Sequence, residues 1–145
     1  MKMKIYFIMA AILMILLNPK SSFASGDGNF NKILTDLDGK CGVNYGLLRP
    51  GSYTANSTGG DFQVKFNSPR AAEYKLYLHE YDPGDNADEH VPGYRNITNS
   101  GAAIWRDLGK YVDGDNNRAE FYVTCASNIE SSTLNYITGD YTYWD

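Results

Sequence analysis

Acidic side chains crowd two segments of the chain that are otherwise rich in turn-forming residues. They fall within residues 82–89 and 113–115: Asp82, Asp85, Asp88 and Glu89, then Asp113 and Asp115. Carboxylates at this density repel one another, and a calcium ion, which takes about six to eight oxygen ligands, relieves that repulsion. A calcium site is therefore one interpretation, and its expected ligands are Asp82, Asp85, Asp88, Asp113 and Asp115.

The later acidic turn begins as an EF-hand loop does but departs from that motif. Arg118 stands where the loop requires glycine, and Thr124 stands where it requires a bidentate glutamate. A solvated acidic loop explains the same residues without a metal. The sequence favours the solvated loop and leaves calcium as the alternative.

Aromatic residues form the second candidate binding feature, because the chain has 12 tyrosines and two tryptophans. A flat ring offers apolar area with a hydrogen-bonding tip, which suits sugar rings and protein surfaces alike. For any single tyrosine, cross-strand packing on a half-exposed sheet is the structural alternative. We predict a ligand-binding face that contains Tyr77, Tyr81, Trp105, Tyr143 and Trp144.

Residues suited to catalysis are scarce. His79 and His90 are the two histidines, and the chain has no Gly-x-Ser-x-Gly, His-Glu-x-x-His or phosphate-binding glycine motif. A surface histidine without a catalytic role is the more common case. We therefore predict that the protein is not an enzyme and has no cofactor apart from the calcium considered above.

The elements that would position these residues are mostly strands. Apolar and polar residues alternate over residues 61–66, 74–81 and 119–126, with weaker candidates at 43–48, 102–112, 134–138 and 141–144. Glycine, proline, asparagine and aspartate separate these segments. This pattern predicts a mainly β fold, an antiparallel sandwich or barrel of jelly-roll type. Residues 82–101 lack the alternation and predict a long loop at the rim of the binding face.

One segment has the spacing of a helix instead. Apolar residues recur at i, i+3, i+4 and i+7 in the order Phe30, Ile33, Leu34 and Leu37. Asn29 can cap the first turn, and Gly39 can end the last. We predict one short N-terminal helix here.

A local resemblance supports the architecture. Residues 105–123 are similar to jelly-roll domains appended to extracellular bacterial enzymes, in which a tryptophan, a Leu-Gly turn and a later alternating strand recur. Trp105, Leu108 and Gly109 stand at the corresponding places. The resemblance implies a ligand-binding sandwich and assigns no functional residue.

The N-terminus has the features of a secretory signal peptide. Lys2 and Lys4 precede the apolar residues 5–17, and Ser22 and Ala24 supply the small residues that a signal peptidase reads. The apolar run has 13 residues, shorter than the roughly 20 of a membrane-spanning helix, although a retained anchor is the alternative. We predict that residues 1–24 are removed and that residues 25–145 form a single secreted domain, extracellular or, in a Gram-negative source, periplasmic.

The two cysteines fit this compartment. Outside the cytosol, Cys41 and Cys125 are expected to form a disulfide that closes the domain, with two buried free thiols as the alternative. Without a Cys-x-x-Cys spacing they match neither a zinc site nor a redox pair.

Charge narrows the range of partners. Loss of the signal peptide removes three lysines, so ten basic and 17 acidic residues remain, a net charge near −7. This argues against nucleic acid and anionic membranes. We predict a monomeric secreted protein that binds a glycan or cell-wall polymer through the aromatic face. The alternative is a secreted inhibitor or toxin-like effector that docks on another protein through its acidic loop.

Overall fold

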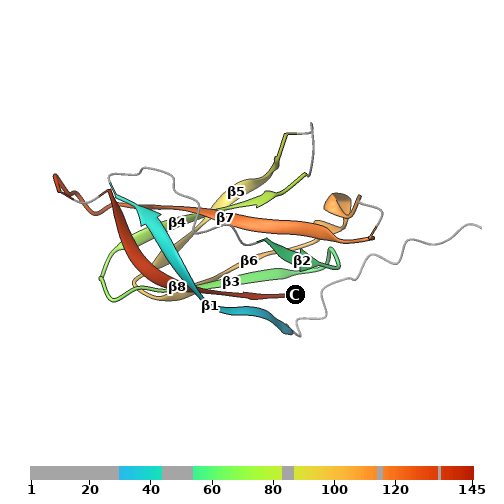
Figure 1. The fold of residues 1–145 in the computed structure, drawn as a ribbon, viewed down its shortest axis with the longest axis horizontal. Helices are drawn as coiled ribbons and strands as arrows, with labels where there is room; N and C mark the ends of the chain where they lie inside the picture. Colours follow the sequence, from blue (N-terminus) through green and yellow to red (C-terminus); the bar gives the residue numbers. More distant parts are fainter. Residues whose placement is uncertain (1–29, 44–53, 83–86, 114–115, 134) are drawn as a thin grey trace, which may run out of the picture.

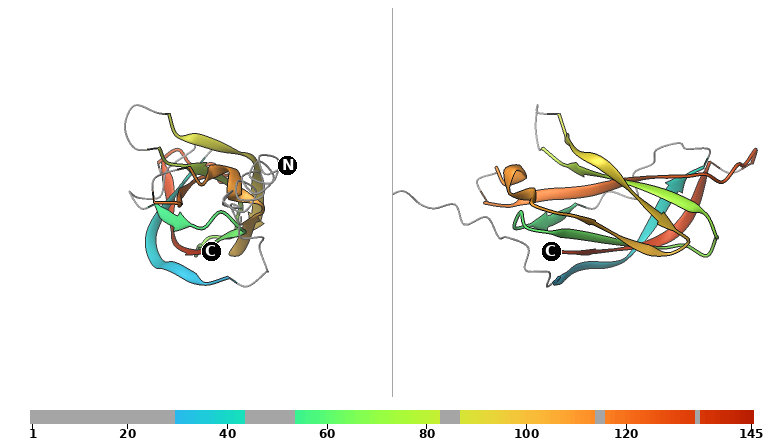
Figure 2. Two further views of the ribbon diagram at one scale, coloured as in Figure 1. Left: turned by 90° about the vertical axis from the view of Figure 1, so that its right-hand side faces the viewer. Right: turned by 180° about the vertical axis from the view of Figure 1, so that it is seen from behind.

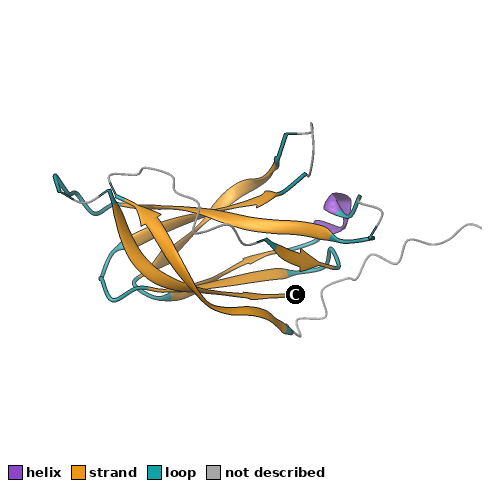
Figure 3. Cartoon of the chain, in the orientation of Figure 1, coloured by secondary structure: helices purple, strands orange, loops and turns teal. Residues whose placement is uncertain are grey.

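The mainly β architecture is confirmed. A computed structural model describes residues 30–43, 54–82, 87–113, 116–133 and 135–145 (Figure 1). The predicted signal peptide lies outside the described residues. Within them, the elements are β1 (Lys32–Gly42), β2 (Ala55–Ser57), β3 (Phe62–Asn67), β4 (Glu73–Glu80), β5 (Glu89–Thr98), β6 (Gly101–Trp105), the 3-10 turn η1 (Leu108–Tyr111), β7 (Ala119–Ser127) and β8 (Tyr136–Trp144). Strands dominate the chain (Figure 3). Of the helices described, none is long and apolar enough to cross a membrane.

The strands form one eight-stranded sheet that curls into a nearly closed barrel. Its order is β5-β4-β7-β1-β8-β3-β6, with β2 paired to β7. Viewed along the long axis, the strands surround a central core (Figure 2). The two ends of the sheet approach each other where Arg95 Nε of β5 donates a hydrogen bond of 2.8 Å to the Ile104 carbonyl of β6. The pairings are antiparallel except for β1 with β7, which is parallel.

The prediction of an N-terminal helix was wrong, because these residues form strand β1. The pairing of β1 with β8 shifts register between Lys32 and Leu34 and again before Leu37. Each shift interrupts the two-residue alternation. Ile33, Leu34 and Leu37 all pack against the core from the strand. Their spacing therefore imitates a helix although the backbone is extended.

Residues 82–101 also differ from the prediction of a long loop. Half of this segment, Glu89–Thr98, is β5, which pairs with β4. Residues 83–86 lie outside the described part of the chain. In place of the two strands predicted at 134–138 and 141–144 there is one continuous strand, β8 (Tyr136–Trp144), because Gly139 of the expected turn pairs directly with Gly39 of β1. Residue 134 lies outside the described residues.

Aromatic side chains fill the centre of the barrel. Phe66 packs on Tyr141 of β8 with a ring-centroid distance of 4.6 Å and on Tyr74 of β4 at 4.9 Å. Phe62 lies 5.1 Å from Phe121 of β7. Phe66 and Tyr141 lie on neighbouring strands, but the contacts with Tyr74 and Phe121 join β3 to strands that are distant in the sheet order. Burial of these rings therefore favours the curled sheet over a flat one.

The predicted disulfide is present and joins β1 to β7. Cys41 Sγ and Cys125 Sγ are bonded, with 4.7 Å between the two Cα atoms, and both residues are buried. The neighbouring residues Gly42 and Ala126 are Cα partners in the parallel pairing. The bond therefore crosses the sheet at the junction of these two strands.

We expect loss of this bond to destabilise the protein. The cysteines are 84 residues apart, so the bond restricts a long loop in the unfolded chain. Breaking it gives the unfolded chain more conformational entropy and should lower the free energy of unfolding by up to about 4 to 5 kcal/mol. Urea denaturation of the oxidised protein and of the Cys41→Ser/Cys125→Ser variant measures the difference. A reductant should lower the midpoint of the parent and leave the variant unchanged; equal midpoints before and after reduction of the parent would contradict the expectation.

Gly139 is expected to be intolerant of a side chain. A Cβ there would lie 2.3 Å from Cε2 of Phe66 and 2.5 Å from the Asn67 carbonyl oxygen, too close for either to remain in place. Gly139→Ala should lower the free energy of unfolding by about 1 to 3 kcal/mol. Thr138→Ala, at the exposed neighbouring position, is the control, and similar denaturation midpoints for the two variants would be inconsistent with this packing.

Candidate functional site

Two groups of side chains stand out near the same part of the sheet. Strand β4 alternates between half-buried and buried positions, so its residues divide between the outer surface and the core. On the outer side lie Tyr77 and His79. On the core side, Glu80 continues the row that begins with Tyr74. One strand thus contributes to an aromatic surface and, at its end, to an acidic cluster.

The outer surface carries a chain of ring contacts. Tyr77 lies 5.5 Å from Tyr94 and 6.1 Å from His90, both on β5. His79 lies 5.0 Å from His90 and stacks on Tyr122 of β7 at 4.9 Å with an interplanar angle of 11°. We call these five residues the aromatic face: Tyr77, His79, His90, Tyr94 and Tyr122.

A bulge in β5 creates this grouping. Tyr77 pairs with Tyr94 and His79 with His90, so β5 advances four residues where β4 advances two. The intervening Gly93 has φ of +82°, a conformation that favours glycine, and Pro92 cannot donate to a ladder. Because of these extra residues, the side chain of Val91 points into the core, while His90 and Tyr94 remain on the surface.

Polar groups border the aromatic face. Tyr122 donates a hydrogen bond of 2.6 Å from its hydroxyl to Asp88, and His79 Nε2 lies 2.9 Å from the Thr124 hydroxyl. Lys75 Nζ sits 5.2 Å from the centroid of the Tyr94 ring. Tyr94 is 47% exposed, which leaves much of its ring available to a ligand.

The structure places the predicted aromatic residues in different environments. Tyr77 belongs to the aromatic face, and Tyr81, 37% exposed, follows the end of β4. Trp144 is half-buried on β8, with β7 and β1 between β8 and β4 in the sheet. The expectation of one surface patch that includes both tryptophans is therefore wrong.

The prediction that Trp105 and Tyr143 lie on the ligand-binding surface was wrong, since each is only 1% exposed. Tyr143 points into the barrel, 5.8 Å from the Phe62 ring. Trp105 lies on β6, where the guanidinium of Arg95 covers its ring at 5.4 Å from the centroid. Both pack in the core and are unavailable to an external ligand.

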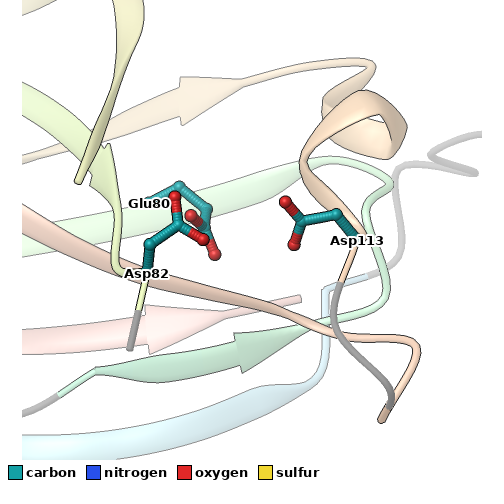
Figure 4. Close-up of side chains that lie close together, drawn as sticks. All are labelled: Glu80, Asp82 and Asp113. Carbon is teal, nitrogen blue, oxygen red and sulfur yellow. The ribbon is translucent and has the colours of Figure 1, made fainter. Parts of the chain in front are cut away.

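Three carboxylates meet at one end of the barrel. One carboxylate oxygen from each of Glu80, Asp82 and Asp113 lies within 4.8 Å of the other two. Glu80 and Asp82 come from the end of β4, and Asp113 faces them from the segment after η1 (Figure 4). Of the predicted metal ligands, Asp82 and Asp113 converge, Asp88 binds Tyr122 instead, and Asp85 and Asp115 lie outside the described residues.

The packing of η1 explains how Asp113 reaches this position. Tyr111 is buried and makes an edge contact with Phe121 at 5.9 Å. Phe121 is the Cα partner of Glu80 in the β4–β7 ladder. Asp113, two residues after Tyr111, is thereby held beside the end of β4.

Glu80 is the member that the sequence analysis missed. It is 1% exposed, and its Oε1 accepts a hydrogen bond of 3.3 Å from the Glu120 backbone N–H. The pKa of Glu80 is raised to about 7, mainly by burial and then by the negative charges of Asp82, Asp113 and Glu120, although the hydrogen bond from Glu120 lowers it. The signal was available: a glutamate at a core-facing position of an alternating strand needs a partner or a proton.

Comparison with known proteins places the chain in a family. A family described as "YndA coiled coil domain" matches residues 41–136. The chain is also similar to "Uncharacterized protein YndA" of Bacillus subtilis (strain 168), with 33% identity over 128 residues, 88% of each chain. The chain belongs to the YndA family. No solved structure matches it.

The name of the YndA family refers to a coiled coil, which requires long helices with a seven-residue repeat. In the described part of residues 41–136 the backbone forms strands, and its helical content is the four-residue turn η1. The matched range includes both cysteines, the aromatic face and the three carboxylates. The aromatic face and the three carboxylates thus both lie in the segment that the family match covers.

The buried position of Glu80 predicts that, with chelator present, the stability of the protein depends on pH. Its pKa is higher in the folded protein than the ordinary 4.5, so the folded state holds the proton more tightly. Stability should therefore fall as pH rises from about 4.5 to about 7, by up to about 3 kcal/mol. Urea denaturation of the parent and Glu80→Gln should give similar stabilities at pH 5 and a more stable variant at pH 8.

The same amide substitution at the exposed Glu130, beyond the other end of β7, controls for the change in net charge. If Glu80→Gln and Glu130→Gln change stability equally at both pH values, the buried carboxyl is not the source of the effect.

Proposed function

We propose that this protein is a small secreted binding protein that holds a glycan or cell-wall polymer against the aromatic face. The observation that carries the proposal is the chain of ring contacts on the outside of three adjacent strands. Tyr94 and His90 are exposed and Tyr77 and His79 half-buried, whereas Tyr122, only 8% exposed, supports the ring of His79. Sugar rings present flat patches of C–H groups that pack on aromatic faces, while hydroxyls bond to the surrounding polar groups.

The geometry of the sheet suits an extended ligand. Strands β5, β4 and β7 lie side by side in the sheet order, so the rings form a row across them. Because the rings also contact one another, little conformational entropy remains to be lost when a ligand binds. Thr124, Asp88 and Lys75 supply donors and acceptors at the border.

Two observations support secretion within this proposal. The N-terminal sequence predicts a signal peptide, and the Cys41–Cys125 disulfide is typical of proteins that function outside the cytosol. We propose a binding role in preference to catalysis, because both histidines of the chain take part in the ring contacts of the aromatic face.

The test is retention on insoluble polysaccharide and on peptidoglycan. Tyr94→Ala and Tyr77→Ala should each weaken binding roughly tenfold, because each removes a ring from the face. Tyr136→Ala is the matched control: Tyr136 is 40% exposed but lies on β8. Retention that is equal in the three variants and the parent would contradict the proposal.

Salt dependence separates this proposal from an acidic protein-docking role. Exposed Asp88 and Glu89 adjoin the aromatic face, and they would attract a basic protein surface. Binding through rings should change little between low and high salt, whereas charge-driven association should slow steeply. A steep loss of association rate with salt would favour the inhibitor or effector role.

A further inference from the structure

We propose that Glu80, Asp82 and Asp113 form a calcium site that ties the end of β4 to the segment following η1. The proposal is independent of any glycan, since Glu80 lies on the core side of β4 and the aromatic face lies on its outer side. It also differs from the calcium site considered from the sequence, which lacked Glu80 and included Asp88.

The first observation is the convergence of three carboxylates without a cation among the described side chains. Their oxygens lie within 4.8 Å of one another. No lysine or arginine in the described part of the chain forms an ion pair with any of the three; the recorded pair is Arg106 with Asp61. The nearby charges that act on Glu80 are Asp82, Asp113 and Glu120, all of them acidic.

The second observation is independent of the cluster's charge. Glu80 is 1% exposed, and its Oε2 is buried without a hydrogen-bond partner. A buried carboxylate oxygen with no donor is costly, so such atoms normally have a proton donor or a metal. The carboxylate of Glu80 lies beside that of Asp82, and the carboxylate of Asp113 faces both of them (Figure 4).

The donor set selects the kind of ion. Three carboxylates supply only oxygen, the ligand of hard cations, and each can bind through one or both of its oxygens. Asp82 is half-buried and Asp113 is exposed, so water can complete the shell from the solvent side. Calcium accepts such mixed and irregular coordination, whereas magnesium requires a near-octahedral shell at shorter distances.

A calcium ion here would have a structural consequence. It would bridge residues 80 and 82, at the end of β4, to residue 113, which precedes β7. We therefore expect calcium to raise the melting temperature, because binding to the folded state alone stabilises it.

The experiment titrates calcium, and separately magnesium, into full-length protein stripped with chelator, with heat of binding and melting temperature as readouts. Calcium should bind and raise the melting temperature, and magnesium should do so less. Asp113→Asn should weaken calcium binding at least about tenfold. This residue is exposed, so its substitution should leave folding intact.

Glu80→Gln should weaken calcium binding similarly, with near-ultraviolet circular dichroism confirming that the variant folds. Glu130→Gln, which removes the same charge far from the cluster, should bind calcium as the parent does. If calcium does not change the melting temperature of the parent, the proposal is overturned. Protonation of Glu80 would then be what stabilises the cluster. An equal calcium-dependent rise in melting temperature in the parent and all variants would also overturn the proposal, because calcium would then act only by screening the acidic surface.

Discussion

The junction between β1 and β7 is the constraint on which the rest of the structure depends. It joins the β5-β4-β7 part of the sheet to the β1-β8-β3-β6 part, yet its recorded pairing is the one Cα pair Gly42 and Ala126. The Cys41–Cys125 bond lies beside that pair. A covalent bond thus reinforces the shortest ladder of the sheet, and the aromatic core holds the two parts together inside the barrel.

Both functional proposals concern the β5-β4-β7 part of the sheet and follow from the alternation of β4. Tyr77 and His79 project outward, where the bulge in β5 brings His90 and Tyr94 against them. Glu80 projects inward at the end of the strand, where η1 places Asp113 opposite. Two surfaces of one strand can therefore serve separate purposes, an aromatic contact outside and a charged cluster at the mouth of the barrel.

Sequence reasoning succeeded where the signal is local. The alternation over residues 61–66, 74–81 and 119–126 matched β3, β4 and β7, because a strand buried on one face must alternate. It failed at β1, where two register shifts disturb that period and give Ile33, Leu34 and Leu37 a helical spacing. It also missed β5, whose bulge around Pro92 and Gly93 resembles a loop in sequence.

The sequence by itself determined which side of each regular strand faces the core and, with only two cysteines, which disulfide can form. The tertiary structure alone decided that Trp105 is buried beneath Arg95 and that Asp113 meets Glu80. The reason is physical: the facing of a side chain follows from the two-residue period of its own strand. Convergence of distant residues depends on strand order, bulges and the closure of the sheet, which arise from long-range pairing and packing.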